Sequence, residues 1–167
     1  MSRNVFGDIA VIPHLPHADQ AFALLTRLAR IVEPIMISRG LFVSRLTEFL
    51  PQPEENLLGL NYGQGWWICI GLRKNNHRGI NQFRPEEDLL DTLLHELTHN
   101  HFGPHDANFH AYLRGLKEQY YLLMSLQGDD RQPERQGDGR YHQDRDRDPG
   151  RRPQVPGGRD HDGMYYW

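Results

Sequence analysis

The sequence predicts an α+β fold, with a small, mostly antiparallel sheet packed on helices and a disordered C-terminal tail. Three observations predict it. Short apolar runs are typical of strands, longer segments repeat apolar residues every three to four positions as helices do, and the composition changes abruptly near Gln127. We therefore place one folded domain at residues 1–127 and the tail at residues 128–167.

The first part of the domain contains a strand, a long helix and a second strand. The run VFGDIAVI predicts a strand at about residues 5–12, and LFVSRLT predicts another at about 41–47. Between them, apolar residues at helical spacing predict a helix from about 18 to 39. Pro34 should kink or split that helix, because proline lacks a backbone N–H and its ring clashes with the preceding turn.

Two further strands should form a hairpin. LLGLNY, at about 57–62, and WWICIGLR, at about 66–73, are separated by GQG, which is a tight-turn signal. Trp66 and Trp67 alternate across a strand, so we expect one in the core and the other exposed, where it could stack on a base. Cys69 should point inward as a small apolar residue, and as the single cysteine it excludes an intramolecular disulfide.

Two helices complete the domain. Pro85 opens the first, and the acidic residues that follow it complement the helix dipole. This helix should run to about His101 and stop at Gly103-Pro104. Asp106 is the expected N-cap of the last helix. An apolar stripe along that helix consists of Phe109, Leu113, Leu116, Tyr120 and Leu123.

The tail is rich in Gly, Pro, Asp and Arg, and it cannot bury enough apolar surface to offset the entropy of ordering it. A net charge of −3 gives the whole chain no basic footprint for nucleic acid. No apolar run approaches the length of a membrane span, and the N-terminus lacks the pattern of a secretory signal. We expect a soluble, intracellular protein without a membrane partner.

The stretch LLHELTHNHFGPHD, residues 93–106, indicates a metal site. His95 and His99 are four positions apart, so they lie one turn from each other on the helix face opposite the leucines. Two imidazoles at this spacing can hold one zinc ion, and Glu96 beside them can act as a general base. After the helix ends, the chain returns with His105 as a third nitrogen ligand. Three protein ligands and one open position are typical of a catalytic zinc site.

Two acidic residues are candidates for orienting the zinc ligands. Asp91 and Asp88 share the histidine face one and two turns earlier, so either can accept a hydrogen bond from a ligand N–H. Both can equally be solvated acids near the start of the helix.

The loop leading into this helix carries the cationic cluster that we consider for DNA. Because the chain is mildly acidic, contact with DNA phosphates should come from a local patch. The candidate residues are Arg73, Lys74, Arg78 and Arg84. An ordinary solvated loop is the alternative, and the arginines of the tail are a rival source of DNA contacts.

The segment HELTHNHFGPHDANFHAYLRGLKEQY resembles the signature of the WLM-domain metalloproteases, the Wss-like relatives of the Spartan proteases. The likeness extends upstream through LLGLNYGQG and EEDLLDTLLHELTHN and covers about residues 9–120. It implies a zincin-like domain with a small sheet against the active-site helix. By position, it also implies zinc ligands at His95, His99 and His105 and a catalytic glutamate at Glu96.

The same resemblance implies protein substrates crosslinked to DNA, activation by DNA, a nuclear location and work alongside SUMO or ubiquitin. Two features depart from related patterns. Gly103 lies one position later than in the metzincins and no obvious Met-turn follows, so a metzincin proper is disfavoured. The tail lacks the cluster of Val, Ile and Leu beside acids that a SUMO-binding segment needs.

The sequence thus predicts a zinc-dependent endopeptidase of the WLM type that acts on DNA-bound proteins in DNA repair. One alternative is a peptidase for SUMO or ubiquitin conjugates, and another is a zinc-containing, DNA-associated adaptor without proteolysis. Turnover of a generic unfolded substrate separates the enzymes from the adaptor. Stimulation by DNA separates the first enzyme from the second.

Overall fold

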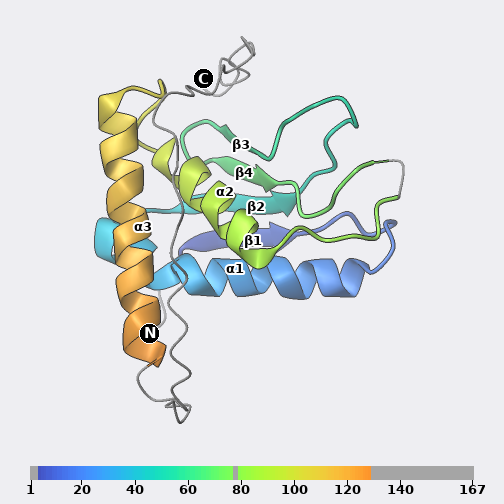
Figure 1. The fold of residues 1–167 in the computed structure, drawn as a ribbon, viewed down its shortest axis with the longest axis horizontal. Helices are drawn as coiled ribbons and strands as arrows, with labels where there is room; N and C mark the ends of the chain where they lie inside the picture. The colour runs from blue at the N-terminus through green and yellow to red at the C-terminus, as the bar shows by residue number, and fades with distance from the viewer. Residues whose placement is uncertain (1–3, 77–78, 129–167) are drawn as a thin grey trace, which may run out of the picture.

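The computed structural model describes residues 4–76 and 79–128, and within these residues the chain forms four strands and three helices (Figure 1). The α+β class is confirmed, and each predicted strand and helix is found within a few residues of its expected ends. The strands are β1 (Phe6–Ala10), β2 (Val43–Glu48), β3 (Gly59–Tyr62) and β4 (Trp67–Ile70). The helices are α1 (Ala18–Arg39), α2 (Glu86–Thr98) and α3 (Ala107–Gly128).

The strands form one mixed sheet in the order β1-β2-β4-β3. β1 pairs with β2 in parallel, β2 pairs with β4 in parallel, and β3 and β4 form the expected antiparallel hairpin. The prediction of a mostly antiparallel sheet is therefore wrong. The reason lies in the connections: α1 returns the chain between β1 and β2, and such a crossover makes neighbouring strands parallel.

The helix α1 continues through Pro34 as one element, so the predicted split does not occur. Pro34 is exposed, whereas its neighbours on the other side of the helix are fully buried: Val32, Ile35 and Met36. A proline inside a helix costs about 3 kcal/mol. Burying three large apolar side chains stabilises the helix by roughly 1.5–3 kcal/mol each, which offsets that cost.

One core joins the helices to the sheet. Leu46 of β2 and Ile68 of β4 belong to the same buried cluster as apolar residues of α1 and the leucines of α2. Leu116 of α3 joins this cluster, and Figure 1 shows α3 crossing the ends of α1 and α2. Because the leucine face of α2 is buried, its other face is left for polar side chains. Over the described residues, no helix is long and apolar enough to cross a bilayer.

Candidate metal centre

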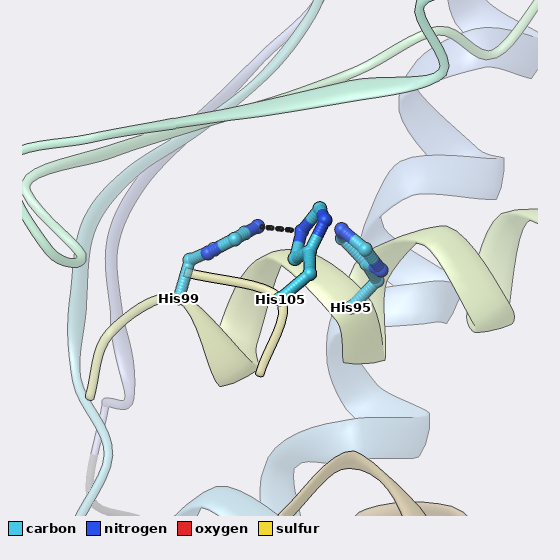
Figure 2. Close-up of side chains that lie close together, drawn as sticks. All are labelled: His95, His99 and His105. Carbon is cyan, nitrogen blue, oxygen red and sulfur yellow. Dashed lines mark hydrogen bonds between the residues drawn. The ribbon is translucent and has the colours of Figure 1, made fainter. Parts of the chain in front are cut away.

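Three histidines converge between α2 and α3 (Figure 2). His95 lies on α2, His99 follows its last residue, and His105 lies in the turn before α3. Their ligand atoms all lie within 4.8 Å of one another, and the Nε2 atoms of His99 and His105 are 3.0 Å apart. The structure thus brings together the three side chains that the helical spacing and the returning turn predict.

The donor set fits a zinc ion. Imidazole nitrogens suit zinc, whereas magnesium and calcium prefer oxygen ligands. Zinc–nitrogen bonds of about 2.0–2.1 Å place two ligand atoms of a tetrahedron about 3.4 Å apart. This separation is close to the 3.0 Å between the two Nε2 atoms, so small side-chain adjustments bring the three nitrogens into range.

A main-chain carbonyl orients one of the candidate ligands. Nδ1 of His99 lies 2.9 Å from the carbonyl oxygen of Phe102. Because a carbonyl oxygen can only accept, Nδ1 carries the proton and Nε2 keeps its lone pair on the side of the cluster. Sequence reasoning missed this partner, since a backbone atom leaves no residue signature.

The two candidate acids take other positions. Asp91 is exposed and pairs with Lys117 of α3, with Oδ1 and Nζ 3.3 Å apart. Asp88 is also exposed, and its backbone carbonyl accepts a hydrogen bond from the hydroxyl of Thr92. This arrangement favours the second interpretation given above, in which both acids are solvated.

Phe109 of α3 closes one side of the cluster. Its fully buried ring lies with its centroid 4.9, 4.7 and 4.5 Å from those of His95, His99 and His105. The Phe109 N–H donates to Oδ1 of Asp106 at 3.0 Å, which confirms the predicted N-cap. The sequence placed Phe109 only in an apolar stripe. Its position four residues after a candidate ligand was the available signal for this second role.

Burial keeps His95 in its neutral form. Desolvation, followed by the neighbouring imidazoles of His99 and His105, lowers the pKa of His95 to about 3. The ring therefore retains a lone pair for a metal across the neutral pH range.

Glu96 is buried against strand β3, with 3% of its surface exposed. A Cβ atom on Gly59 would lie 2.8 Å from Oε1 of Glu96, so a glycine is needed for this close approach. A cleft of about 320 Å³ opens beside them. Its lining includes Glu96, His95, residues 56–59 and, from α3, Leu113 and Lys117. The cleft therefore brings a candidate ligand and the candidate base to one solvent-accessible surface.

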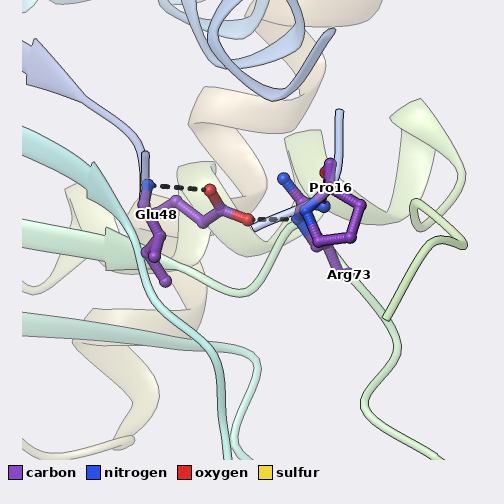
Figure 3. Close-up of polar contacts among 4 residues, drawn as sticks. Pro16, Glu48 and Arg73 are labelled. Atoms are coloured by element: carbon purple, nitrogen blue, oxygen red, sulfur yellow. Dashed lines mark hydrogen bonds and ion pairs between the residues drawn. The ribbon is translucent and has the colours of Figure 1, made fainter. Parts of the chain in front are cut away.

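Arg73, the first residue of the predicted DNA-contacting cluster, does not reach the surface. Arg73 is fully buried, and its Nε lies 2.6 Å from Oε1 of Glu48 (Figure 3). Its guanidinium also donates to the carbonyl of Pro16, and the other Glu48 oxygen accepts from the Ile12 N–H at 3.1 Å. The role proposed for Arg73 is therefore wrong, because its charge is committed inside the domain. It joins the loop before α1 to the end of β2.

The other three residues of that cluster are Lys74, Arg78 and Arg84. Lys74 and Arg84 are half-buried, and the Nε of Arg84 is inaccessible to solvent. Arg78 lies outside the described residues. The predicted disordered tail and the boundary at residue 127 also depend on residues beyond that range.

Comparison with known proteins gives consistent matches. The model of the WLM domain family matches residues 4–162. The chain is 38% identical over 115 residues to the DNA-dependent metalloprotease WSS1 of Saccharomyces cerevisiae, covering 69% of this chain and 42% of that protein. It is 35% identical over 124 residues to the DNA-dependent metalloprotease WSS1 homolog 2 of Schizosaccharomyces pombe, covering 71% and 43%. The chain thus spans less than half the length of these curated relatives.

Solved structures agree with the fold. The crystal structure of Wss1 from S. cerevisiae superposes with a TM-score of 0.70 at 33% identity, covering 74% of this chain and 94% of that one. Wss1 from S. pombe superposes with a TM-score of 0.60 at 35% identity, covering 70% and 93%. Because the family match extends over nearly the whole sequence and the relatives share the fold, this chain belongs to the WLM domain family.

Proposed function

We propose that this chain is a zinc-dependent endopeptidase that cleaves proteins bound to DNA and is activated by DNA. The observation that carries the proposal is the convergence of three imidazoles, one of which, His95, lines an open cleft together with the buried Glu96. The names of the relatives, DNA-dependent metalloproteases, support the same activity. A substrate on chromosomal DNA implies action in the nucleus.

The proposed ligands are His95, His99 and His105. A zinc ion held by them supplies Lewis-acid chemistry, which acidifies water and polarises a scissile carbonyl. Glu96 accepts a proton from the attacking water as the water oxygen bonds to the carbonyl carbon. Glu96 then gives that proton to the amide nitrogen as the C–N bond breaks. Phe109 packs against all three imidazoles, and the cleft beside His95 and Glu96 is open to solvent.

Protease assays on the purified chain test this function. We expect an unfolded protein such as reduced casein to be cleaved when zinc is present and not after chelation. Single-stranded DNA should increase the rate. Cleavage that is indifferent to DNA would remove the DNA dependence and favour a different peptidase. A zinc-loaded chain that cleaves nothing, even with DNA present, would favour a non-proteolytic adaptor.

A further inference from the structure

One face of the sheet carries a row of side chains that touch one another. Tyr62, Trp67, Arg45 and Asp8 occupy paired positions on β3, β4, β2 and β1. The rings of Tyr62 and Trp67 lie 5.3 Å apart, Arg45 Cζ lies 5.7 Å from the Trp67 ring, and Arg45 pairs with Asp8 at 3.6 Å.

This row points away from the main core. The next residues along β2 and β4, Leu46 and Ile68, are fully buried in the cluster that contains α1 and α2. Because successive strand residues point to opposite faces, the row lies on the face that these helices leave uncovered. Trp66 lies in the turn just before β4, outside this alternation, and its ring is 6.4 Å from that of Trp67 and nearly perpendicular to it. We call Tyr62, Trp66, Trp67 and Arg45 the hairpin aromatic surface.

The hairpin aromatic surface is accessible and partly fixed in place. Trp66 is 62% exposed, Tyr62 is 38% exposed, and half of the Arg45 side chain is exposed. Trp67 is half-buried, and its indole N–H donates to Oγ1 of Thr47 at 2.8 Å. The expected exposed tryptophan is Trp66, whereas Trp67, expected in the core, is half-buried and packs against Leu60 and Cys69 outside the main core. Aromatic rings this exposed, next to a cation, are typical of contact surfaces.

We propose that the hairpin aromatic surface binds single-stranded nucleic acid, with bases stacked on Tyr62 and Trp66 and a phosphate near Arg45. This inference rests on the proposed function, in which DNA is the activator. Aromatic rings on a sheet offer stacking platforms for unpaired bases, and arginine adds cation–π and phosphate contacts. The solvent-exposed pair with Asp8 leaves Arg45 able to exchange its partner for a phosphate. A duplex hides the faces of its bases, so single strands should be preferred.

The hairpin of β3 and β4 contacts α2 with the face opposite to the hairpin aromatic surface. Asn61, next to Tyr62, is fully buried, and its Nδ2 donates to the backbone carbonyl of Glu96 at 2.7 Å. Its Oδ1 accepts from the N–H of Gly65 at 2.8 Å, directly before Trp66. Nucleic acid on this surface would therefore bind the segment that holds the backbone of Glu96, which gives a physical route for activation.

Binding of a labelled oligothymidine to the full chain, measured by fluorescence anisotropy, tests the inference. The parent carries Glu96→Gln, so that no proteolysis occurs during titration. Adding Trp66→Ala or Tyr62→Ala should weaken binding about five- to a hundredfold, whereas Trp66→Phe should retain most of the affinity. Arg45→Gln should reduce the slope of log affinity against log salt by about 0.7. Tyr121→Ala is the control, since Tyr121 is 63% exposed on α3, and it should bind like the parent.

Each variant should match the parent in zinc content and thermal unfolding midpoint, so that weaker binding reports lost contacts. Parent-like affinity in both Trp66→Ala and Tyr62→Ala would overturn the inference, as would an equal loss in Tyr121→Ala. The two proposals fail separately. Loss of oligothymidine binding in the Trp66 variant with no proteolysis by the unsubstituted chain would contradict the proposed function alone. Proteolysis by that chain with unchanged binding in the variants would contradict this inference alone.

Discussion

Single imidazole nitrogens determine whether the histidine cluster can hold a metal. His105 supplies one of three, and it comes from a turn rather than from the helix that carries His95. Replacing His105 with alanine should lower bound zinc from about one ion per chain to well below that, because two protein ligands hold zinc much more weakly than three. His101→Ala is the matched control, since His101 is exposed on the same turn. Metal analysis after gel filtration that finds full occupancy in His105→Ala would remove it from the site.

The lowered pKa of His95 has a consequence for the metal-free protein. The unfolded chain protonates this imidazole below its ordinary pKa of about 6.5, whereas the folded chain keeps it neutral down to about pH 3. The contribution of His95 to stability is therefore present above pH 6.5 and is lost as the pH falls toward 3. Urea unfolding of chelated protein should show this decline, and His95→Gln should show a shallower one. If the free energy of unfolding fell equally steeply with pH in the two proteins, the lowered pKa of His95 would be contradicted.

At the scale of secondary structure, α2 is held to the hairpin by Asn61. The side chain donates to the Glu96 carbonyl and to Oδ1 of Asn100 and accepts from Gly65 N–H, so it joins the end of α2 to the turn between β3 and β4. Asn61→Ala removes the acceptor of the buried Gly65 N–H and one donor each from the Glu96 carbonyl and the half-buried Asn100 Oδ1. A buried group left without a partner costs on the order of 1–3 kcal/mol.

We therefore expect Asn61→Ala to lower the free energy of unfolding by at least about 2 kcal/mol and to reduce proteolysis. Asn75→Ala is the control, because it removes one amide hydrogen bond, to the Pro51 carbonyl, from a loop. Asn75→Ala should lower the free energy of unfolding by about 1 kcal/mol or less. Denaturant titrations in which the two variants lose equal stability would show that Asn61 has no special structural role.

The secondary structure was largely predictable because it depends on local spacing. The apolar period of α1 and the GQG turn of the hairpin were both present in contiguous sequence. The parallel pairing of β2 with β1 and β4 was not, since it depends on contacts between distant segments. The histidine cluster was predictable for the same reason as the helices: two members share one helix face and the third follows one turn later.

On the scale of the whole molecule, the pair of Arg73 and Glu48 illustrates what local reasoning cannot detect. Arg73 lies among polar loop residues, and its partner is 25 positions earlier on a strand that appeared ordinary. Both side chains of this pair have no exposed surface. We therefore expect mutation of Arg73 to reduce the stability of the protein rather than its affinity for DNA.

Replacing Arg73 with methionine would leave the Glu48 carboxylate buried without its cation. Removing one partner of a buried ion pair typically costs about 3–5 kcal/mol, so the thermal unfolding midpoint should fall sharply. Lys74→Met is the control, since Lys74 is the next residue, is half-buried and takes no part in the Arg73–Glu48 pair. Calorimetry that finds Arg73→Met as stable as Lys74→Met would contradict the structural assignment.

Proteolysis by a Glu96→Gln protein, compared with the parent at equal zinc content, tests the assignment of this chain as a zinc peptidase most directly. Glutamine keeps the shape of the side chain and the metal ligands but cannot accept a proton from water. We expect unchanged zinc, an unfolding midpoint close to that of the parent, and a loss of turnover of about a hundred- to ten-thousandfold. Near-parental turnover in a folded, zinc-loaded Glu96→Gln protein would contradict the proposed chemistry.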